Sequence, residues 1–169
     1  MKFKVVKQKD SMQCGIACLS SICLHYGVKY SLTFLEELCH PTSEGISLKA
    51  IADGANKLGL HTRTGLITED YFEENNMPCI LHWGQNHFVV LYKINKSKTR
   101  FYIADPAKGL MIFTRQEFCN HWICTRSNGE EKGIAMFLNP TEKFGDIQCQ
   151  DVGEKRSFTF LFGYITKYR

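Results

Sequence analysis

The pattern of apolar and polar positions changes character about half-way along the chain. In the first half, apolar residues recur at helical spacing, which predicts a helix over residues 15–26 and another that begins after Ser47. Thr33 and Glu36 have the spacing of a capping box, so a helix is also expected to start at Thr33. A further short helix is expected over residues 68–74. The first half is therefore predicted to be mainly helical.

Beyond residue 78 the pattern consists of short apolar or alternating runs, which are typical of strands. We expect strands over residues 79–83, 87–94, 99–104, 110–113 and 133–138. Short polar segments between the first four runs favour antiparallel hairpins, and Thr114 with Glu117 predicts one more short helix. A helical half followed by an antiparallel half predicts an α+β fold, with helices and sheet packed as two layers or lobes.

Length and charge set broad limits on the function. A chain of 169 residues has the size of one compact domain, and 44% hydrophobic with 22% charged residues is ordinary for a globular protein. The 21 basic and 17 acidic residues give a net charge of +4, which is too small and too dispersed to indicate a nucleic-acid surface. We therefore expect no nucleic-acid partner.

The cellular compartment can be inferred from the N-terminus and the cysteines. Residues 1–10 alternate basic and apolar side chains and lack the apolar stretch of a secretory signal. No run approaches the roughly 18 apolar residues of a membrane span. Eight cysteines without an export signal are more typical of free thiols than of disulfides. These features predict a protein that stays in a reducing compartment.

Cys14 lies at the start of the first predicted helix. A helix N-terminus stabilises a thiolate, so this cysteine is a candidate nucleophile. Gly15 follows it, and the missing side chain is expected to let a substrate backbone approach the sulfur. The alternative interpretation is a buried structural cysteine at a helix start. Cys18 and Cys23, inside the same helix, are expected to be core residues.

A base and its orienting group are expected from the hairpin over residues 87–104. If Ile94 pairs with Thr99, His87 faces residue 106, and a one-residue bulge would set it opposite Asp105. An imidazole and a carboxylate would then be close enough to hydrogen-bond. The sequence leaves the register open, and a surface histidine beside an Asp-Pro turn is the alternative interpretation.

A side-chain amide that could stabilise a developing oxyanion precedes the candidate nucleophile. Gln8 lies six residues before Cys14, and Gln or Asn amides donate to oxyanions in acyl-transfer sites. Gln13 is the competing amide, but its position next to Cys14 makes it less able to reach over a substrate carbonyl. Gln8 is therefore the preferred candidate.

A metal site is a second possible explanation for some of the cysteines and histidines. Cys119, His121 and Cys124 lie within six residues of one another, and a fourth ligand could come from Cys39, His40 or His82. The spacing lacks the paired blocks of common zinc modules, and residues 119–122 are typical of the apolar end of a helix with Trp122 in the core. We expect no metal and no cofactor.

Four blocks in this order, Gln8 and residues 13–19, 84–90 and 103–106, resemble the double-glycine leader peptidase family, the N-terminal domains of bacteriocin-processing ABC transporters. The similarity runs from about residue 3 to residue 140. It implies a papain-like fold with Cys14 as nucleophile, His87 as base and then acid, Asp105 orienting the imidazole and Gln8 in the oxyanion hole. One departure is Gln13, because the family often has Asp before the cysteine.

The same resemblance implies a substrate and partners. The substrate would be a peptide precursor cut after a Gly-Gly type motif that ends its leader, and the partners would be the transmembrane and ATP-binding domains of an ABC transporter. It also implies a place at the cytoplasmic face of the bacterial inner membrane. Residues 1–140 would form the peptidase domain, and 141–169 a linker and the start of a segment that leads to a transmembrane domain.

Two alternatives remain open at this point. The chain is expected to be part of a transporter, because residues 156–165 resemble the stretch before a first transmembrane helix, but a free-standing peptidase also fits. No G-x-x-x-x-G-K-[ST] motif occurs, so the chain itself has no P-loop. A catalytically silent domain that only binds leaders is the alternative function.

Overall fold

A computed structural model describes residues 2–84 and 86–148 of the chain. The helices are α1 (Cys14–His25), α2 (Leu32–Cys39), α3 (Leu48–Lys57) and α4 (Arg115–Trp122). The strands are β1 (Leu60–Ile67), β2 (Cys79–Trp83), β3 (His87–Ile94), β4 (Arg100–Asp105), β5 (Gly109–Thr114), β6 (Thr125–Ser127) and β7 (Glu130–Pro140). Short 3-10 turns occupy Ser11–Gln13, Glu69–Tyr71 and Glu74–Asn76.

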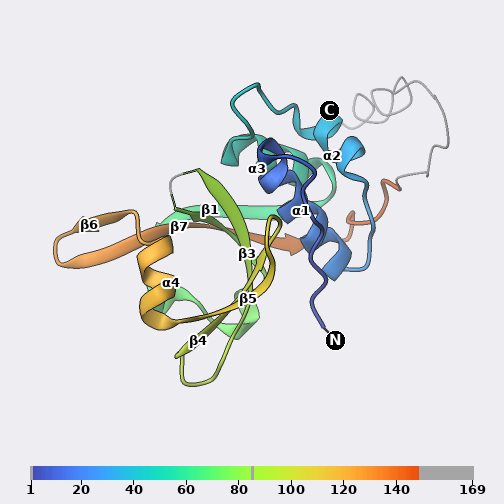
Figure 1. Cartoon of the computed structure of the whole chain (residues 1–169). Coiled ribbons are helices and arrows are strands. Elements are labelled where there is room, and N and C mark those ends of the chain that lie inside the picture. Colours follow the sequence, from blue (N-terminus) through green and yellow to red (C-terminus); the bar gives the residue numbers. More distant parts are fainter. Residues whose placement is uncertain (1, 85, 149–169) are drawn as a thin grey trace.

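The strands form one antiparallel sheet with helices on both faces (Figure 1). Its order is β1-β7-β2-β3-β4-β5, and β6 pairs with β7 as an extension. Alternate residues of β3 point to different cores: Phe88 and Val90 pack with the helices α1 to α3, whereas Val89 and Leu91 pack with α4. The predicted α+β fold, with N-terminal helices packed on an antiparallel sheet, is confirmed.

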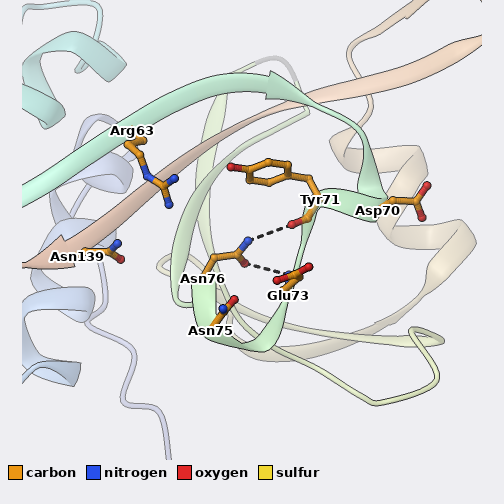
Figure 2. A pocket seen from close by; sticks show the side chains of 7 residues that line it. All are labelled: Arg63, Asp70, Tyr71, Glu73, Asn75, Asn76 and Asn139. Carbon is orange, nitrogen blue, oxygen red and sulfur yellow. Dashed lines mark hydrogen bonds between the residues drawn. The ribbon is translucent and has the colours of Figure 1, made fainter.

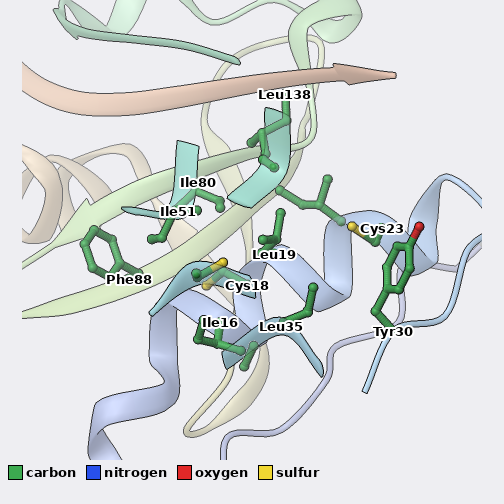
Figure 3. Packing of buried hydrophobic residues seen from close by; sticks show 14 of the residues in the cluster. Ile16, Cys18, Leu19, Cys23, Tyr30, Leu35, Ile51, Ile80, Phe88 and Leu138 are labelled. Carbon is green, nitrogen blue, oxygen red and sulfur yellow. The ribbon is translucent and has the colours of Figure 1, made fainter. Parts of the chain in front are cut away.

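Helix α1 is the centre of the larger core. Ile16, Leu19 and Ile22 have no exposed surface, and Figure 3 shows Ile16 and Leu19 among side chains from α2, α3 and the sheet. A helix that is apolar on all sides has to be surrounded by other elements. Because α1 is fixed in this way, the residue at its first position, Cys14, is held against the sheet.

The predicted helices are largely present. The first is α1, and Ser47 caps α3 by accepting a hydrogen bond from Ala50 N at 3.1 Å. The cap of α2 was predicted at the wrong residue, because Ser31 rather than Thr33 accepts the bond from Phe34 N. A serine two residues earlier satisfies the free N–H groups of the first turn just as well. Where a helix was expected over residues 68–74, the structure has one 3-10 turn at Glu69–Tyr71, and a second follows at Glu74–Asn76.

The predicted strands all occur, with ends shifted by up to three residues, but β1 and β6 were missed. Strand β1 lies at one edge of the sheet and is only partly buried along most of its length, with His61 and Arg63 among its more accessible positions. Such a strand lacks the apolar alternation of a half-buried strand, and Gly65 weakens the signal further. Strand β6 is only three residues long.

The register of the β3–β4 hairpin differs from the expected one. Ile94 pairs with Phe101, not with Thr99, and a bulge between Leu91 and Lys93 shifts the remaining pairs. Val90 then pairs with Ala104, so continuing the register would set Asp105 opposite Val89. His87 and Asp105 are therefore diagonal neighbours and not directly opposed, a separation that longer side chains still bridge.

Residues that follow β7 return to the helical layer. Thr141 N donates to Gly59 O at 2.9 Å, Tyr30 donates its hydroxyl to Ile147 O at 2.6 Å, and Phe144 packs against Tyr26. The domain boundary at residue 140 stays a prediction, and residues 149–169 lie outside the described part. Within that described part, no helix has the length and apolar character needed to cross a membrane.

Candidate active site

Cys14 is the first residue of α1 and is almost buried, with 5% of its surface exposed. The 3-10 turn before it is capped by Asp10, whose Oδ1 accepts from Met12 N at 2.8 Å. Burial by itself raises the pKa of Cys14, but hydrogen bonds from the His87 side chain and the Phe88 N–H outweigh it. The pKa of Cys14 therefore lies below its ordinary value.

His87 is the first residue of β3 and lies between Cys14 and Asp105. Its Nε2 is 2.8 Å from Asp105 Oδ1, which leaves Nδ1 to face the sulfur of Cys14. The hydrogen bond with Asp105, followed by the one with Cys14, raises the pKa of His87 to about 9 against the effect of burial. Lowered thiol pKa and raised imidazole pKa both favour a thiolate–imidazolium pair, and the two groups titrate together.

Asp105 ends β4 and is 4% exposed. Burial raises the pKa of its carboxyl, but the hydrogen bond with His87 and the Ala107 N–H, 2.8 Å from Oδ1, lower it overall. A carboxylate that is both charged and fixed by the following turn orients the imidazole and stabilises its positive charge. Cys14, His87 and Asp105 thus form a continuous hydrogen-bonded chain.

Gln8 lies in the N-terminal segment, between the turn after Asp105 and the turn before Cys14. Its N–H donates to Pro106 O at 3.0 Å, and its side-chain Oε1 is buried with no hydrogen-bond partner among the described residues. The competing amide is already engaged: Gln13 Oε1 accepts from Lys9 N at 2.8 Å, and Nε2 donates to Glu36 at 2.5 Å. Gln13 is therefore unavailable to an oxyanion, and Gln8 is the amide that remains.

Gly15 is needed for packing and not for access to the sulfur. A Cβ at this position would come within 2.6 Å of Ile46 Cγ2 and 2.7 Å of Ile51 Cδ1, with Phe88 next at 3.3 Å. The expectation that this glycine opens space for a substrate backbone was wrong, because apolar side chains already fill that space. The glycine instead lets α1 approach α3 and β3 closely enough to set Cys14 beside His87.

The site contains features that could not be foreseen from motifs. The Phe88 N–H that stabilises the Cys14 thiolate depends on how β3 crosses the helix start. The contact of Gln13 with Glu36 joins residues 23 positions apart, in two different elements. Only the Ala107 N–H had a sequence signal, because an Asp commonly accepts from the backbone two residues later.

A family model supplies the deciding comparison. The Peptidase C39 family model matches residues 2–128. The chain belongs to the peptidase C39 family. Its papain-like α+β architecture agrees with this, since the peptidase domain of Streptococcus ComA superposes with a TM-score of 0.69 and 30% identity, over 83% of this chain and 100% of that one.

Other similar proteins are larger or contain a bound peptide. The colicin V secretion/processing ATP-binding protein CvaB of Escherichia coli is 34% identical over 83% of the chain, and LagD of Lactococcus lactis, a lactococcin-G-processing and transport ATP-binding protein, 28% over 98%. The chain spans only 18% and 24% of their lengths. A double glycine motif protease from an AMS/PCAT transporter, solved with its leader peptide, is 27% identical with a TM-score of 0.67, over 83% of this chain and 93% of that one.

Four other thiols in the described part of this C39 domain lack the activation of Cys14. Burial raises the pKa values of Cys18 and Cys79, that of Cys39 to about 11 and that of Cys23 to about 12. Each of these four side chains is buried in one of the two cores, as expected for Cys18 and Cys23. A high pKa keeps a thiol protonated and unreactive. The electrostatics therefore separate Cys14 from these cysteines.

The alternative metal site finds no support in the C39 domain. Within residues 2–84 and 86–148, no group of three His, Cys, Asp or Glu side chains is arranged to hold a metal ion. Cys119 donates its thiol to Glu69 at 3.2 Å, and His121 Nδ1 lies 2.8 Å from Glu117 O in its own helix. Trp122 is buried, as expected.

A polar hollow of about 510 Å³ lies beside the turns that connect β1 to β2 (Figure 2). It is formed by side chains from β1, β7 and the turns between β1 and β2: Arg63, Asp70, Tyr71, Glu73, Asn75, Asn76 and Asn139. Inside it Asn76 donates to Tyr71 O and accepts from Glu73 N, as Figure 2 shows. Cys14, His87 and Asp105 do not line this hollow, and the Asn76 amide serves to fix the local turns.

Proposed function

We propose that this C39 domain is a cysteine endopeptidase that removes the leader of secreted peptide precursors by cutting after a Gly-Gly type motif. The observation that carries the proposal is the hydrogen-bonded chain from Cys14 through His87 to Asp105, with the thiol pKa lowered and the imidazole pKa raised. A structural cysteine needs neither an imidazole nor an oriented carboxylate. Nucleophilic catalysis needs both.

The geometry supports a two-step acyl transfer. The Cys14 thiolate attacks the carbonyl carbon of the second glycine, and the side-chain amide of Gln8 stabilises the oxyanion that forms. His87 donates its proton to the leaving amine, the C–N bond breaks, and a thioester on Cys14 remains. His87, now neutral, deprotonates a water molecule that hydrolyses the thioester and releases the leader with a free carboxylate. Asp105 holds the imidazole in place throughout.

Specificity for two glycines has a steric explanation. Residues without side chains pass through a cleft that is too narrow for a Cβ, so most other sequences are rejected. Two glycines offer little surface for binding, so the rest of the affinity has to come from the leader, and an amphipathic helix docked by its apolar face would supply it. The solved relative with a bound leader peptide supports a leader-dependent substrate.

The partners would be the transmembrane and ATP-binding domains of an ABC exporter. The larger relatives are four to five times longer than this chain and are described as secretion or transport and processing proteins that bind ATP. As the N-terminal part of such an exporter, the domain would lie at the cytoplasmic face of the bacterial inner membrane. Residues 1–140 would be the peptidase, and 141–169 would connect it to the membrane domain.

Cleavage of a model precursor tests the proposal. The protein is incubated with a peptide that carries a leader ending in Gly-Gly, and the products are identified by mass spectrometry. We expect one cut after the second glycine, no cut with Cys14→Ala, and full activity with Cys124→Ala, which removes an exposed thiol outside the site. Cutting elsewhere would overturn the specificity. Binding without cutting by the unmutated protein would instead establish a docking domain.

A further inference from the structure

Both peptide groups that flank Gln8 are fixed by hydrogen bonds. The preceding one donates its N–H, that of Gln8 itself, to Pro106 O at 3.0 Å, next to Asp105. The following one donates the N–H of Lys9 to Gln13 Oε1 at 2.8 Å, next to Cys14. The backbone of Gln8 is therefore tied on one side to the turn that carries the carboxylate and on the other to the helix that carries the thiol.

Glu36 determines which way the Gln13 amide points. An amide can turn over and exchange its oxygen and nitrogen, so its orientation depends on its partners. The Glu36 carboxylate only accepts hydrogen bonds, and its Oε1 lies 2.5 Å from Gln13 Nε2. With the nitrogen held there, the oxygen of Gln13 has to face the N–H of Lys9. A bond to an ionised acceptor is stronger than one between neutral groups.

The side chain of Gln13 does not cap the helix that follows it. Gln13 occupies the N-cap position of α1, but its side chain makes no capping bond to that helix. Asp10 caps the preceding turn, and the apolar core fixes α1 itself. A side chain that is 7% exposed and hydrogen-bonded through both its oxygen and its nitrogen, yet caps no helix, instead joins the segment of Gln8 to α2.

We infer that Gln13 and Glu36 are positioning residues that hold the segment of Gln8 so that its amide faces the oxyanion. This inference rests on the proposed function, in which Gln8 supplies that amide. Glu36 orients Gln13, Gln13 holds the peptide between Gln8 and Lys9, and the amide of Gln8 needs no rearrangement when negative charge develops. Preorganised donors of this kind stabilise a transition state more than they stabilise bound substrate.

A charge-exchange cycle tests the inference. In Gln13→Glu the new carboxylate still accepts from Lys9 N but faces the carboxylate of Glu36, and the two repel each other. In Glu36→Gln an oxygen acceptor for Gln13 is kept. In the double variant, which combines both substitutions, the amide now at position 36 donates to the carboxylate now at position 13. Both hydrogen bonds are then restored, with donor and acceptor exchanged between the two side chains.

A matched control comes from the neighbouring residue of the same helix. Glu37→Gln removes an identical charge one position along α2, on the exposed side of that helix and away from Gln13. The control therefore reports any effect of lowering the negative charge of α2 that does not pass through the contact between Gln13 and Glu36.

The expected results differ in a defined order. Gln13→Glu lowers kcat about 10- to 100-fold with little change in KM, which is less than the roughly 10²- to 10³-fold loss typical of removing an oxyanion donor. Glu36→Gln lowers kcat about three- to tenfold, because a neutral amide at position 36 no longer fixes which way the Gln13 amide points, whereas Glu37→Gln and the double variant stay within about threefold of the unmutated protein. The rate and pH profile of Cys14 alkylation by iodoacetamide stay unchanged in all four, because the thiolate has its own partners.

Three outcomes would overturn the inference. These are an unchanged kcat in Gln13→Glu, a double variant as slow as Gln13→Glu, or a Cys14 alkylation rate that falls together with kcat. Circular dichroism and the Tm of each variant show that the fold is kept. If the unmutated protein cuts the precursor and the cycle gives one of these outcomes, the inference alone fails. If the unmutated protein does not cut, the proposed function fails.

Discussion

Replacing Asp105 by Asn removes the charge behind His87 while keeping the shape of the side chain. The amide oxygen can still accept from His87 Nε2 and from the Ala107 N–H, both of which lie 2.8 Å from Oδ1 in the structure. The change therefore isolates the electrostatic part of the contact. We expect its main consequence at His87, because Asp105 is the largest cause of the raised imidazole pKa.

The size of the effect follows from that pKa. His87 has a pKa of about 9 in place of its ordinary 6.5, which corresponds to about 3 kcal/mol in favour of the charged imidazole. Cys14 supplies part of this difference and remains in the variant. The activity should fall at high pH when the His87 imidazole loses its proton. We therefore expect Asp105→Asn to lower the pKa of this fall by about 1 to 2, and to reduce activity at about pH 8.5 roughly tenfold more than at about pH 6.

The assay is the pH dependence of kcat/KM for precursor cleavage, measured from about pH 5 to about pH 10. Asp53→Asn is the control, because that carboxylate is exposed and pairs with Lys49 in its own helix. If kcat/KM of Asp105→Asn falls at the same high pH as that of the unmutated protein, the reasoning is refuted, because His87 would then owe its raised pKa to something other than this charge. Equal losses at both pH values would refute it as well.

His87 also makes a pH-dependent contribution to the stability of the fold. A raised pKa in the folded state stabilises the fold fully below the unfolded value of 6.5, and this contribution is lost as the pH rises through about 9. Asp105 has the opposite sign: its lowered pKa stabilises the fold above the ordinary value of 3.8, and this is lost as the pH falls. The Tm of the unmutated protein should therefore fall more steeply between pH 6.5 and about 9 than that of Asp105→Asn.

Two further predictions concern packing. Gly15→Ala should lower the free energy of unfolding by about 1 to 3 kcal/mol in urea denaturation, because its Cβ would push into Ile46 and Ile51. Gly65→Ala is the control and should be nearly neutral, because its Cβ meets only one atom, at 3.9 Å. Equal losses of stability in the two variants would contradict this prediction. Compared with a chain that ends after residue 148, a chain that ends after residue 140 should be about 2 to 4 kcal/mol less stable, because it lacks the partly buried Phe144 and three hydrogen bonds to the rest of the domain. If the chain that ends after residue 140 is as stable as the chain that ends after residue 148, the result would support a domain boundary at residue 140.

Local patterns were sufficient to predict most elements of this fold. Helix α1, the capping box of Thr114 with Glu117 and the strands β2 and β3 follow from periodicity and turn chemistry, because each depends on residues close in sequence. The edge strand β1 was missed, since its partial exposure removes the apolar alternation on which such a prediction depends. Strand β7, with which β1 pairs, begins more than sixty residues later, so no local pattern indicates the pairing.

The site shows the same division. The closeness of His87 to Asp105 was predictable, because a hairpin brings its strands together whatever the exact register. The register itself depends on a bulge at residues 91–93, which no turn motif announces. Gln8 came from the family resemblance more than from local physics, and its role is still a proposal. The packing task of Gly15 depends on three side chains from distant segments, so it could not be predicted.

The position of β7 in the sheet has a consequence for when the fold can be completed. This strand is the last long element of the described chain to be synthesised, yet it lies between β1 and β2, and its Met136 and Leu138 complete the core around α1. A growing chain that already contains Cys14, His87 and Asp105 still lacks the strand that joins the edge β1 to the rest of the sheet. The order of the strands thus means that the sheet beneath α1 can be completed only after β7 has been synthesised.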